Sequence, residues 1–286
     1  MQDKTELSRE DYTDPQCPFC TDQYQKEPPV RSVPIGRILT KLDESLGRND
    51  YAEAERLLLY WVREAELGYD LRGEFQLRNE MMGLYRKLGD RDAAMENADR
   101  ALSLAERAGL TGTVAAATAL INAATVRKAF GMAHEAISLF DRAREIYERE
   151  LPPDDPRLAG LYNNMGLALT DVRSFAEARD CYNRAIAILS ASGGNEPETA
   201  ITCLNLANLE EAEAGLENGA EAIEAELTRA RELLETPELP HNGNYAFVCE
   251  KCAPTFEYYG HFAYARELTE RAKSIYDRNG TVTELL

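Results

Sequence analysis

Apolar side chains recur at helical spacing along most of the chain, in paired runs separated by short turns. In the middle of the chain Asn164-Met165-Gly166 opens one such run, and Ala178, Tyr182 and Ala185 mark the next. The segment Val172-Arg173-Ser174-Phe175 separates them. Residues three and four positions apart share one face of a helix, so the pattern predicts two antiparallel helices joined by a short turn.

The same pattern returns at intervals of about 42 residues. Asn122 lies 42 residues before Asn164, and Asn205 lies 41 residues after it. A repeat of this length is typical of a helical solenoid, in which each hairpin buries its apolar face against the next. The sequence therefore predicts an array of helical hairpins.

The array is predicted to contain about six hairpins over residues 35–280. Five prolines and scattered charges in residues 1–34 indicate an extended arm before it. The pair Asn279-Gly280 is a predicted helix stop, which leaves a tail over residues 281–286. In the fifth hairpin the second helix comes about four residues late, so an extended helix or an inserted loop is expected around residues 215–219.

Small residues are expected where the two helices of a hairpin approach each other closely. We predict that Gly166 on one helix faces Ala178 on the other, and that Ala124 faces Ala136 in the preceding hairpin. Larger apolar residues one turn away then fill the remaining space.

This arrangement resembles the tetratricopeptide repeat, although that repeat is usually about 34 residues long. The connector over residues 150–159, followed by Tyr162-Asn163-Asn164, resembles the long repeats of kinesin light chains. The resemblance implies an all-α, right-handed superhelical solenoid without enzymatic activity. It also implies an adaptor, scaffold or sensor that binds a peptide or protein segment in its concave groove. The alternative is a structural array for oligomerisation, whose groove is filled by its own arm or by a second copy.

Charge restricts the partners of such an array. The formal net charge is −18, which repels nucleic acid and anionic membranes. The charge is uneven, because residues 194–240 carry twelve acids and only two basic residues. No basic leader or apolar run of about 18 residues is present, so a cytoplasmic protein with reduced thiols is expected.

Three asparagines are the first candidate binding residues. In the register that the resemblance implies, Asn122, Asn164 and Asn205 point into the groove. An amide both donates and accepts hydrogen bonds, so a row of amides is predicted to bind an extended peptide through its backbone. The alternative interpretation is that each amide bridges neighbouring helices of the array.

Basic and polar residues near this row are candidates for ligand specificity. In the same register Arg86, Lys87, Lys128 and Asn163 lie in or beside the groove. Basic groups there are suited to the carboxylates of an acidic peptide or to a free C-terminus. Solvated side chains on a helix surface are the alternative.

Two Cys-x-x-Cys pairs raise the question of a zinc site. Cys17 and Cys20 lie in the arm, and Cys249 and Cys252 lie in the sixth hairpin. Four thiolates would form a tetrahedral site, but 229 residues separate the pairs, and buried thiols explain the second pair without metal. The first pair also resembles the glutaredoxin dithiol, which needs a βαβ context that this sequence lacks. We therefore predict no redox activity and no cofactor, with a zinc ion bound by these four cysteines as the alternative.

No other catalytic motif is present. The three histidines are widely spaced, and neither of the common glycine-rich phosphate-binding motifs occurs. The sequence thus favours an interaction module over an enzyme.

Overall fold

The computed structural model describes residues 30–283, and this part of the chain contains helices and turns but no strand. Two compact units are formed by Met1–Leu77 and Arg78–Leu286, and their boundary falls inside the third helix. The helices are α1 (Ile35–Gly47), α2 (Tyr51–Leu67), α3 (Leu71–Leu88), α4 (Arg91–Arg107), α5 (Val114–Ala129), α6 (Ala133–Glu150), α7 (Pro156–Asp171), α8 (Phe175–Ser192), α9 (Glu196–Leu234), α10 (Gly243–Tyr258) and α11 (Phe262–Thr283).

The first unit contains the hairpin of α1 and α2 and the start of α3. Leu42 of α1 and Leu58 of α2 are fully buried in it. The described residues of the predicted arm, 30–34, contact the end of α2. The backbone N–H of Arg31 donates to the carbonyl of Gly68 at 2.9 Å. The Asp70 carboxylate accepts from the N–H of Val33 at 2.9 Å. Residues 1–29 lie outside the described part of the chain.

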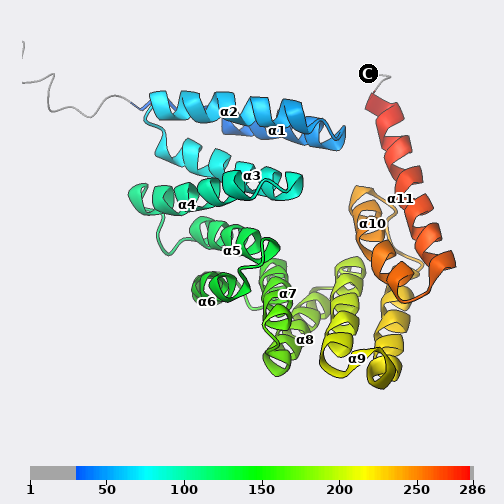
Figure 1. Cartoon of the computed structure of the whole chain (residues 1–286). Coiled ribbons are helices and arrows are strands. Elements are labelled where there is room, and N and C mark those ends of the chain that lie inside the picture. The colour runs from blue at the N-terminus through cyan, green and yellow to red at the C-terminus, as the bar shows by residue number, and fades with distance from the viewer. Residues whose placement is uncertain (1–29, 284–286) are drawn as a thin grey trace, which may run out of the picture. The chain divides into compact units, whose positions relative to one another are not determined.

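The second unit is a series of helical hairpins (Figure 1). Within it α5 packs against α6, α7 against α8, and α10 against α11. Successive hairpins contact each other through α4 and α5, α6 and α7, α8 and α9, and α9 and α10. The helices of the two central hairpins are 16–18 residues long, which accounts for the long repeat. The predicted all-α solenoid of hairpins is confirmed.

Helix starts are fixed by capping side chains. At the start of α4 the carboxylate of Asp90 accepts from the N–H of Ala93 at 3.1 Å, and Gly89 before it has a φ of +75°. At the start of α7 Asp155 accepts from the N–H of Arg157, and Pro156 occupies the first helical position. Such caps satisfy N–H groups that have no partner inside the helix.

The final helix differs from its prediction. α11 continues to Thr283, through the Asn279-Gly280 pair that was expected to end it. Glycine in a helix costs only about 1 kcal/mol relative to alanine, so it disfavours a helix without ending it. The predicted tail over residues 281–286 therefore begins inside α11.

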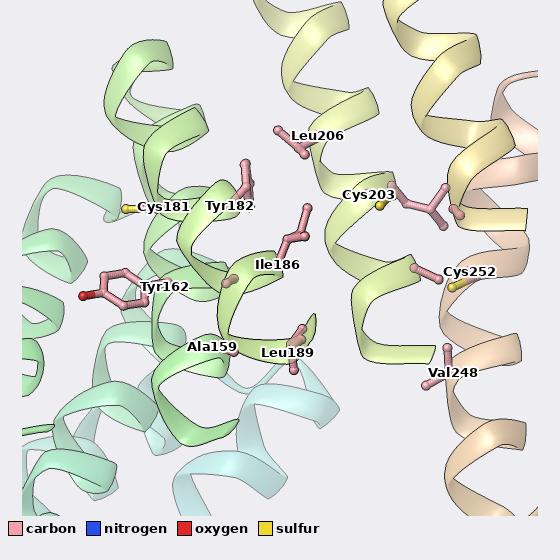
Figure 2. Close-up of a cluster of buried hydrophobic side chains, with 14 of the residues drawn as sticks. Ala159, Tyr162, Cys181, Tyr182, Ile186, Leu189, Cys203, Leu206, Val248 and Cys252 are labelled. Atoms are coloured by element: carbon pink, nitrogen blue, oxygen red, sulfur yellow. The ribbon is translucent and has the colours of Figure 1, made fainter. Parts of the chain in front are cut away.

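A continuous apolar core runs through the second unit, from α5 to α11. Figure 2 shows part of it, where Tyr182 and Ile186 of α8, Leu206 of α9 and Val248 of α10 belong to one buried cluster. Because each hairpin contributes to the layer beneath the next, α9 and α10 are held in place by the same cluster that holds α7 and α8.

Within the fourth hairpin the two helices approach each other closely at Gly166. A Cβ atom at Gly166 would lie 2.5 Å from a ring carbon of Tyr182, a fully buried side chain. Gly166 therefore faces the ring of Tyr182, the larger residue one turn after the buried Ala178 on α8. Even the methyl group of alanine would overlap this ring, so only glycine fits.

The fifth hairpin is formed by a single helical segment with a sharp turn. α9 spans 39 residues, and Gly215 interrupts it with a φ of +80° and a ψ of +165°. No loop is inserted there, and the first helix extends to residue 214. The helix resumes at residue 216, eleven residues after Asn205, just as Phe175 lies eleven residues after Asn164, so the expected delay of four residues is not found. A left-handed φ is readily adopted by glycine alone, which explains the residue at this turn.

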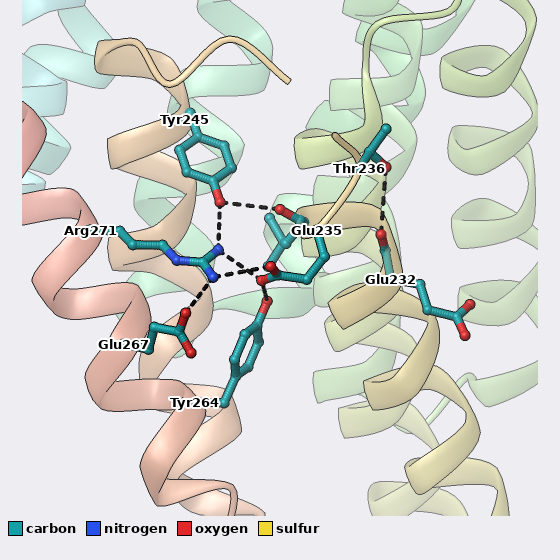
Figure 3. A network of polar contacts seen from close by, with 8 residues as sticks. Glu232, Glu235, Thr236, Tyr245, Tyr264, Glu267 and Arg271 are labelled. Atoms are coloured by element: carbon teal, nitrogen blue, oxygen red, sulfur yellow. Dashed lines mark hydrogen bonds and ion pairs between the residues drawn. The ribbon is translucent and has the colours of Figure 1, made fainter. Parts of the chain in front are cut away.

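A polar network ties the last three helices together (Figure 3). The Arg271 guanidinium of α11 donates to both oxygens of Glu235, which follows α9, at 2.7 and 3.0 Å. Tyr264 donates to the same carboxylate at 2.7 Å, and Arg271 donates to the hydroxyl of Tyr245 on α10 at 2.9 Å. The hydrogen bonds from Arg271 lower the pKa of Glu235 below its usual value.

The contact at Gly166 predicts the effect of a single methyl group. Gly166→Ala is expected to lower the free energy of unfolding by about 1–3 kcal/mol, because the added Cβ would lie 2.5 Å from a ring carbon of the fully buried Tyr182. Gly160→Ala in the same helix is the matched control, since a Cβ there meets no atom within 4 Å. Urea unfolding should show a loss for the first variant and none for the second; equal stability would contradict the described packing.

The network at Glu235 predicts a pH dependence of stability. A carboxyl group whose pKa is lowered by folding stabilises the protein above its unfolded pKa, and this contribution disappears as the pH falls through the folded pKa. Below about pH 4.5, the usual value for this group, wild-type stability should therefore fall more steeply than that of Glu235→Gln. Melting temperatures between neutral and acidic pH test this, with the exposed Glu238→Gln as control. Parallel curves for wild type and Glu235→Gln would contradict it.

Candidate binding face

The first helices of successive hairpins lie next to one another in the second unit. α5 contacts α7, α7 contacts α9, and α9 contacts α10. We use the name first-helix face for the partly exposed side of these helices. It comprises the end of α3, then α5 and α7, the part of α9 before Gly215, and α10. The predicted binding residues of the array lie on these helices.

Two of the three predicted asparagines bridge neighbouring helices. The amide of Asn122 on α5 donates to the side-chain oxygen of Asn79 on α3 at 3.2 Å. The amide of Asn205 on α9 donates to the oxygen of Asn163 on α7 at 2.9 Å. The donor lies 43 residues after its acceptor in one bridge and 42 in the other, so the two bridges are equivalent.

Asn164 has a different environment from the other two. Its amide donates to the carbonyl of Gly160, one turn earlier in its own helix, at 2.8 Å. Its neighbour Asn163 makes the bridge instead. Sequence reasoning did not select Asn79, although the spacing of 43 residues to Asn122 could have identified it.

The bridges leave hydrogen-bonding capacity on each amide. An asparagine has two N–H donors and an oxygen with two lone pairs, and each bridge uses one donor and one lone pair. Asn122, Asn163 and Asn205 are all partly exposed. The face therefore presents amides whose orientation is fixed by a neighbour and which can still bind a further group.

The predicted basic residues are distributed over α3 and α5. Lys128 forms an ion pair with Asp171 at the end of α7, with 3.5 Å between Nζ and the carboxylate oxygen. Arg86 and Lys87 are exposed near the end of α3. Asp171 reduces the charge that Lys128 offers to a ligand, whereas Arg86 and Lys87 lie at the surface.

The cysteines of the second predicted pair are core residues. Cys249 and Cys252 of α10 are fully buried, and Figure 2 shows Cys252 and Cys203 in the cluster between α9 and α10. Burial raises the pKa of Cys203 to about 12 and raises the pKa values of Cys249 and Cys252, so these thiols are protonated at neutral pH. Cys17 and Cys20 lie outside the described residues.

The described residues contain no cluster of three or more His, Cys, Asp and Glu side chains arranged to hold a metal ion. A cavity of about 230 Å³ between α6, α7 and α8 is lined by Arg144, Tyr162 and Cys181, among others. Burial raises the pKa of the Cys181 thiol to about 11, so this thiol is a poor nucleophile at neutral pH. Across the described helices, none has the length and apolar character needed to cross a membrane.

Comparison with known proteins agrees with this architecture. The tetratricopeptide-repeat family matches residues 75–149 and 159–188. None of the curated proteins matches the chain.

Two similar solved structures illustrate the fold. BtubC (BKLC) from P. vanneervenii is 23% identical with a TM-score of 0.60, and the match covers 72% of this chain and 83% of that one. A single-residue variant of nearly identical TPR-like repeats of a candidate kinesin light chain from Podosopora anserina is 15% identical with a TM-score of 0.50, and this match covers 72% and 96% of the two chains. At these identities the likeness concerns the fold alone.

The asparagine bridges predict an energetic coupling between α7 and α9. In a double-mutant cycle of Asn163→Ala and Asn205→Ala, we expect a coupling energy of about 0.5–1.5 kcal/mol, the usual contribution of a neutral hydrogen bond. Urea unfolding provides the measurement. The cycle of Asn164→Ala and Asn205→Ala is the control and should be additive, because these two amides do not bond to each other. Additivity in both cycles would contradict the bridge.

Proposed function

Because the chain is a tetratricopeptide-repeat protein, whose repeats indicate a protein–protein interaction scaffold, we propose that its first-helix face is a concave groove that binds an extended peptide segment. The asparagine amides bind the backbone of this segment. The observation that carries the proposal is the repetition of half-buried amides on the adjacent helices α5, α7 and α9.

The spacing of the helices suits an extended ligand. Packed helices lie about 8–10 Å apart, and an extended chain advances about 3.3 Å per residue. A peptide that crosses the face therefore meets a new helix about every three residues. At each crossing an amide can donate to a backbone carbonyl and accept from a backbone N–H, without regard to the side chains of the peptide.

The bridges also favour binding by holding the amides in place. Asn122 and Asn205 are each oriented by a partner on the next helix, so less side-chain entropy is lost when a ligand binds. An amide that bridges helices and one that binds a peptide are thus compatible roles, because one asparagine has enough donors and lone pairs for both.

A separate partner is favoured over self-association. Two copies of a chain with a formal charge of −18 repel each other at long range. This repulsion weakens the alternative in which a second copy fills the groove.

The test uses Asn164, whose side chain makes no bridge between helices. Peptides are selected on the purified full chain from a random library of about twelve residues, long enough to cross four helices in extended form. Their affinities for wild type and Asn164→Ala are then measured by fluorescence anisotropy. We expect Asn164→Ala to bind about 2- to 13-fold more weakly, as for one lost neutral hydrogen bond, at unchanged stability.

Asn218→Ala is the matched control. Asn218 also donates to the carbonyl four residues earlier in its helix, but it lies after Gly215 and outside the first-helix face. Its replacement should leave peptide affinity unchanged. The proposal fails if no library peptide binds the wild type, or if Asn164→Ala binds the selected peptides as tightly as wild type does.

A further inference from the structure

One side of α10 carries an exposed strip with two aromatic rings. Phe247, Lys251, Pro254 and Tyr258 follow one another at intervals of four, three and four residues, which places them on one side of the helix. Phe247 is 47% exposed and Tyr258 is 63% exposed, so both rings are accessible to a ligand. We call these four residues the α10 strip. Sequence analysis did not identify it.

A carboxylate of α9 is fixed at the end of this strip. The hydroxyl of Tyr258 donates to one oxygen of Glu211 at 2.6 Å, and the hydroxyl of Tyr259 donates to the other at 2.8 Å. The Tyr259 hydroxyl also lies 3.1 Å from the side-chain oxygen of Asn208 and shares its proton between the two acceptors, both of which belong to α9. Each carboxylate oxygen keeps a further lone pair, so Glu211 can accept hydrogen bonds from an additional donor.

Glu211 differs from Glu210 and Glu213 on α9, which both form an ion pair with a basic side chain. Arg179 of α8 pairs with both Glu210 and Glu213. Within the described part of the chain no basic side chain forms an ion pair with Glu211. Its charge is stabilised by two tyrosine hydroxyls and is not neutralised.

The surroundings of the strip favour a cationic ligand. Exposed Glu250 and Glu257 flank it on α10, and Lys251 is the only basic residue of that helix. The Nζ atom of Lys251 lies 5.4 Å from the ring centroid of Phe247, so one ring of the strip already holds a cation against its face. The ring of Tyr258 is exposed beside a carboxylate, the environment in which guanidinium and ammonium groups bind.

We propose that Tyr258 and Glu211 receive an arginine or lysine side chain of the bound segment, so that the ligand is basic where it crosses α10. The cation lies against the Tyr258 ring and donates to the remaining lone pairs of Glu211. This inference rests on the proposed function and assigns the chemistry of one end of the ligand.

The charges also give the ligand a direction. The exposed basic residues Arg86 and Lys87 lie on α3, at the other end of the second unit's series of first helices, whereas Glu211 and the strip lie on α9 and α10. A segment with acidic residues toward α3 and basic residues toward α10 matches both ends. The reversed segment places like charges together at both ends.

The test uses peptides that differ only in charge. Four repeats of Gly-Arg-Ser are compared with the same peptide carrying citrulline or glutamate in place of arginine, by fluorescence anisotropy with the full chain. Glu211→Gln should weaken binding of the arginine peptide about tenfold or more, as for a lost charged hydrogen bond. Tyr258→Ala should weaken it about three- to tenfold, and the citrulline peptide should bind weakly to every variant.

Two control variants separate a site from general attraction. Glu213→Gln removes a charge from the same helix, but one that Arg179 already pairs with. Tyr60→Ala removes a similarly exposed tyrosine from the first unit. Both should bind the arginine peptide within about twofold of wild type, a difference of about 0.4 kcal/mol. Tyr258→Phe keeps the ring and removes only the hydroxyl that donates to Glu211. If Tyr258→Ala is unstable, the affinity for the arginine peptide is measured with Tyr258→Phe in its place.

The outcomes distinguish this inference from the proposed function. If all variants bind the arginine peptide equally, it is attracted by the overall negative charge and the inference is overturned. If library peptides bind in a way that depends on Asn164 but show no preference for arginine or lysine, the proposed function is supported and the cation site at Glu211 and Tyr258 is overturned. If only the arginine peptide binds, and its binding depends on Glu211, the cation site at Glu211 and Tyr258 is supported and backbone binding by the asparagines is overturned.

Discussion

The structure depends on the close contact between the two helices of each hairpin. In the fourth hairpin this contact joins a glycine to the face of a buried tyrosine, Gly166 to Tyr182. A hairpin alone leaves one side of its helices apolar, and stacking covers that side with the next hairpin. Core residues as far apart as Ala117 and Ile275 therefore belong to one buried cluster. The positions of the exposed side chains follow from this stacking, because each first helix can lie only beside the next.

The asparagines show how one residue type serves both the array and its surface. A hydrogen bond between Asn205 and Asn163 joins two helices at their exposed edge, where apolar contact ends. Elsewhere ion pairs such as Lys128 with Asp171 do the same between α5 and α7. A face built from such pairs is polar yet ordered. An ordered polar surface suits a scaffold that must stay hydrated without a partner and offer defined hydrogen bonds with one.

The period and the helix starts could be predicted from sequence because they depend on local patterns. Gly89 and Asp90 are residue types that favour a helix end and a helix start, and Asp90 caps α4. The interval of 42 residues places the hairpins correctly. Contacts across helices were less predictable. A shift of one position decides whether Asn163 or Asn164 reaches the next helix, and the periodic pattern does not resolve a single residue. The α10 strip was missed because apolar periodicity marks buried sides, and an exposed aromatic side chain has the same sequence signal.

The turn at Gly215 has a consequence for how such arrays connect their helices. The second helix of the fourth hairpin begins at Phe175, eleven residues after Asn164, and in the fifth hairpin the helix resumes at residue 216, also eleven residues after Asn205. The fourth hairpin uses residues 172–174 as its turn, whereas the fifth uses Gly215 alone and continues its first helix in place of the other turn residues. The distance along the chain from one helix to the next is therefore kept while the turn itself changes. A glycine that takes up the reversal alone lets a hairpin lengthen one helix without moving the start of the next.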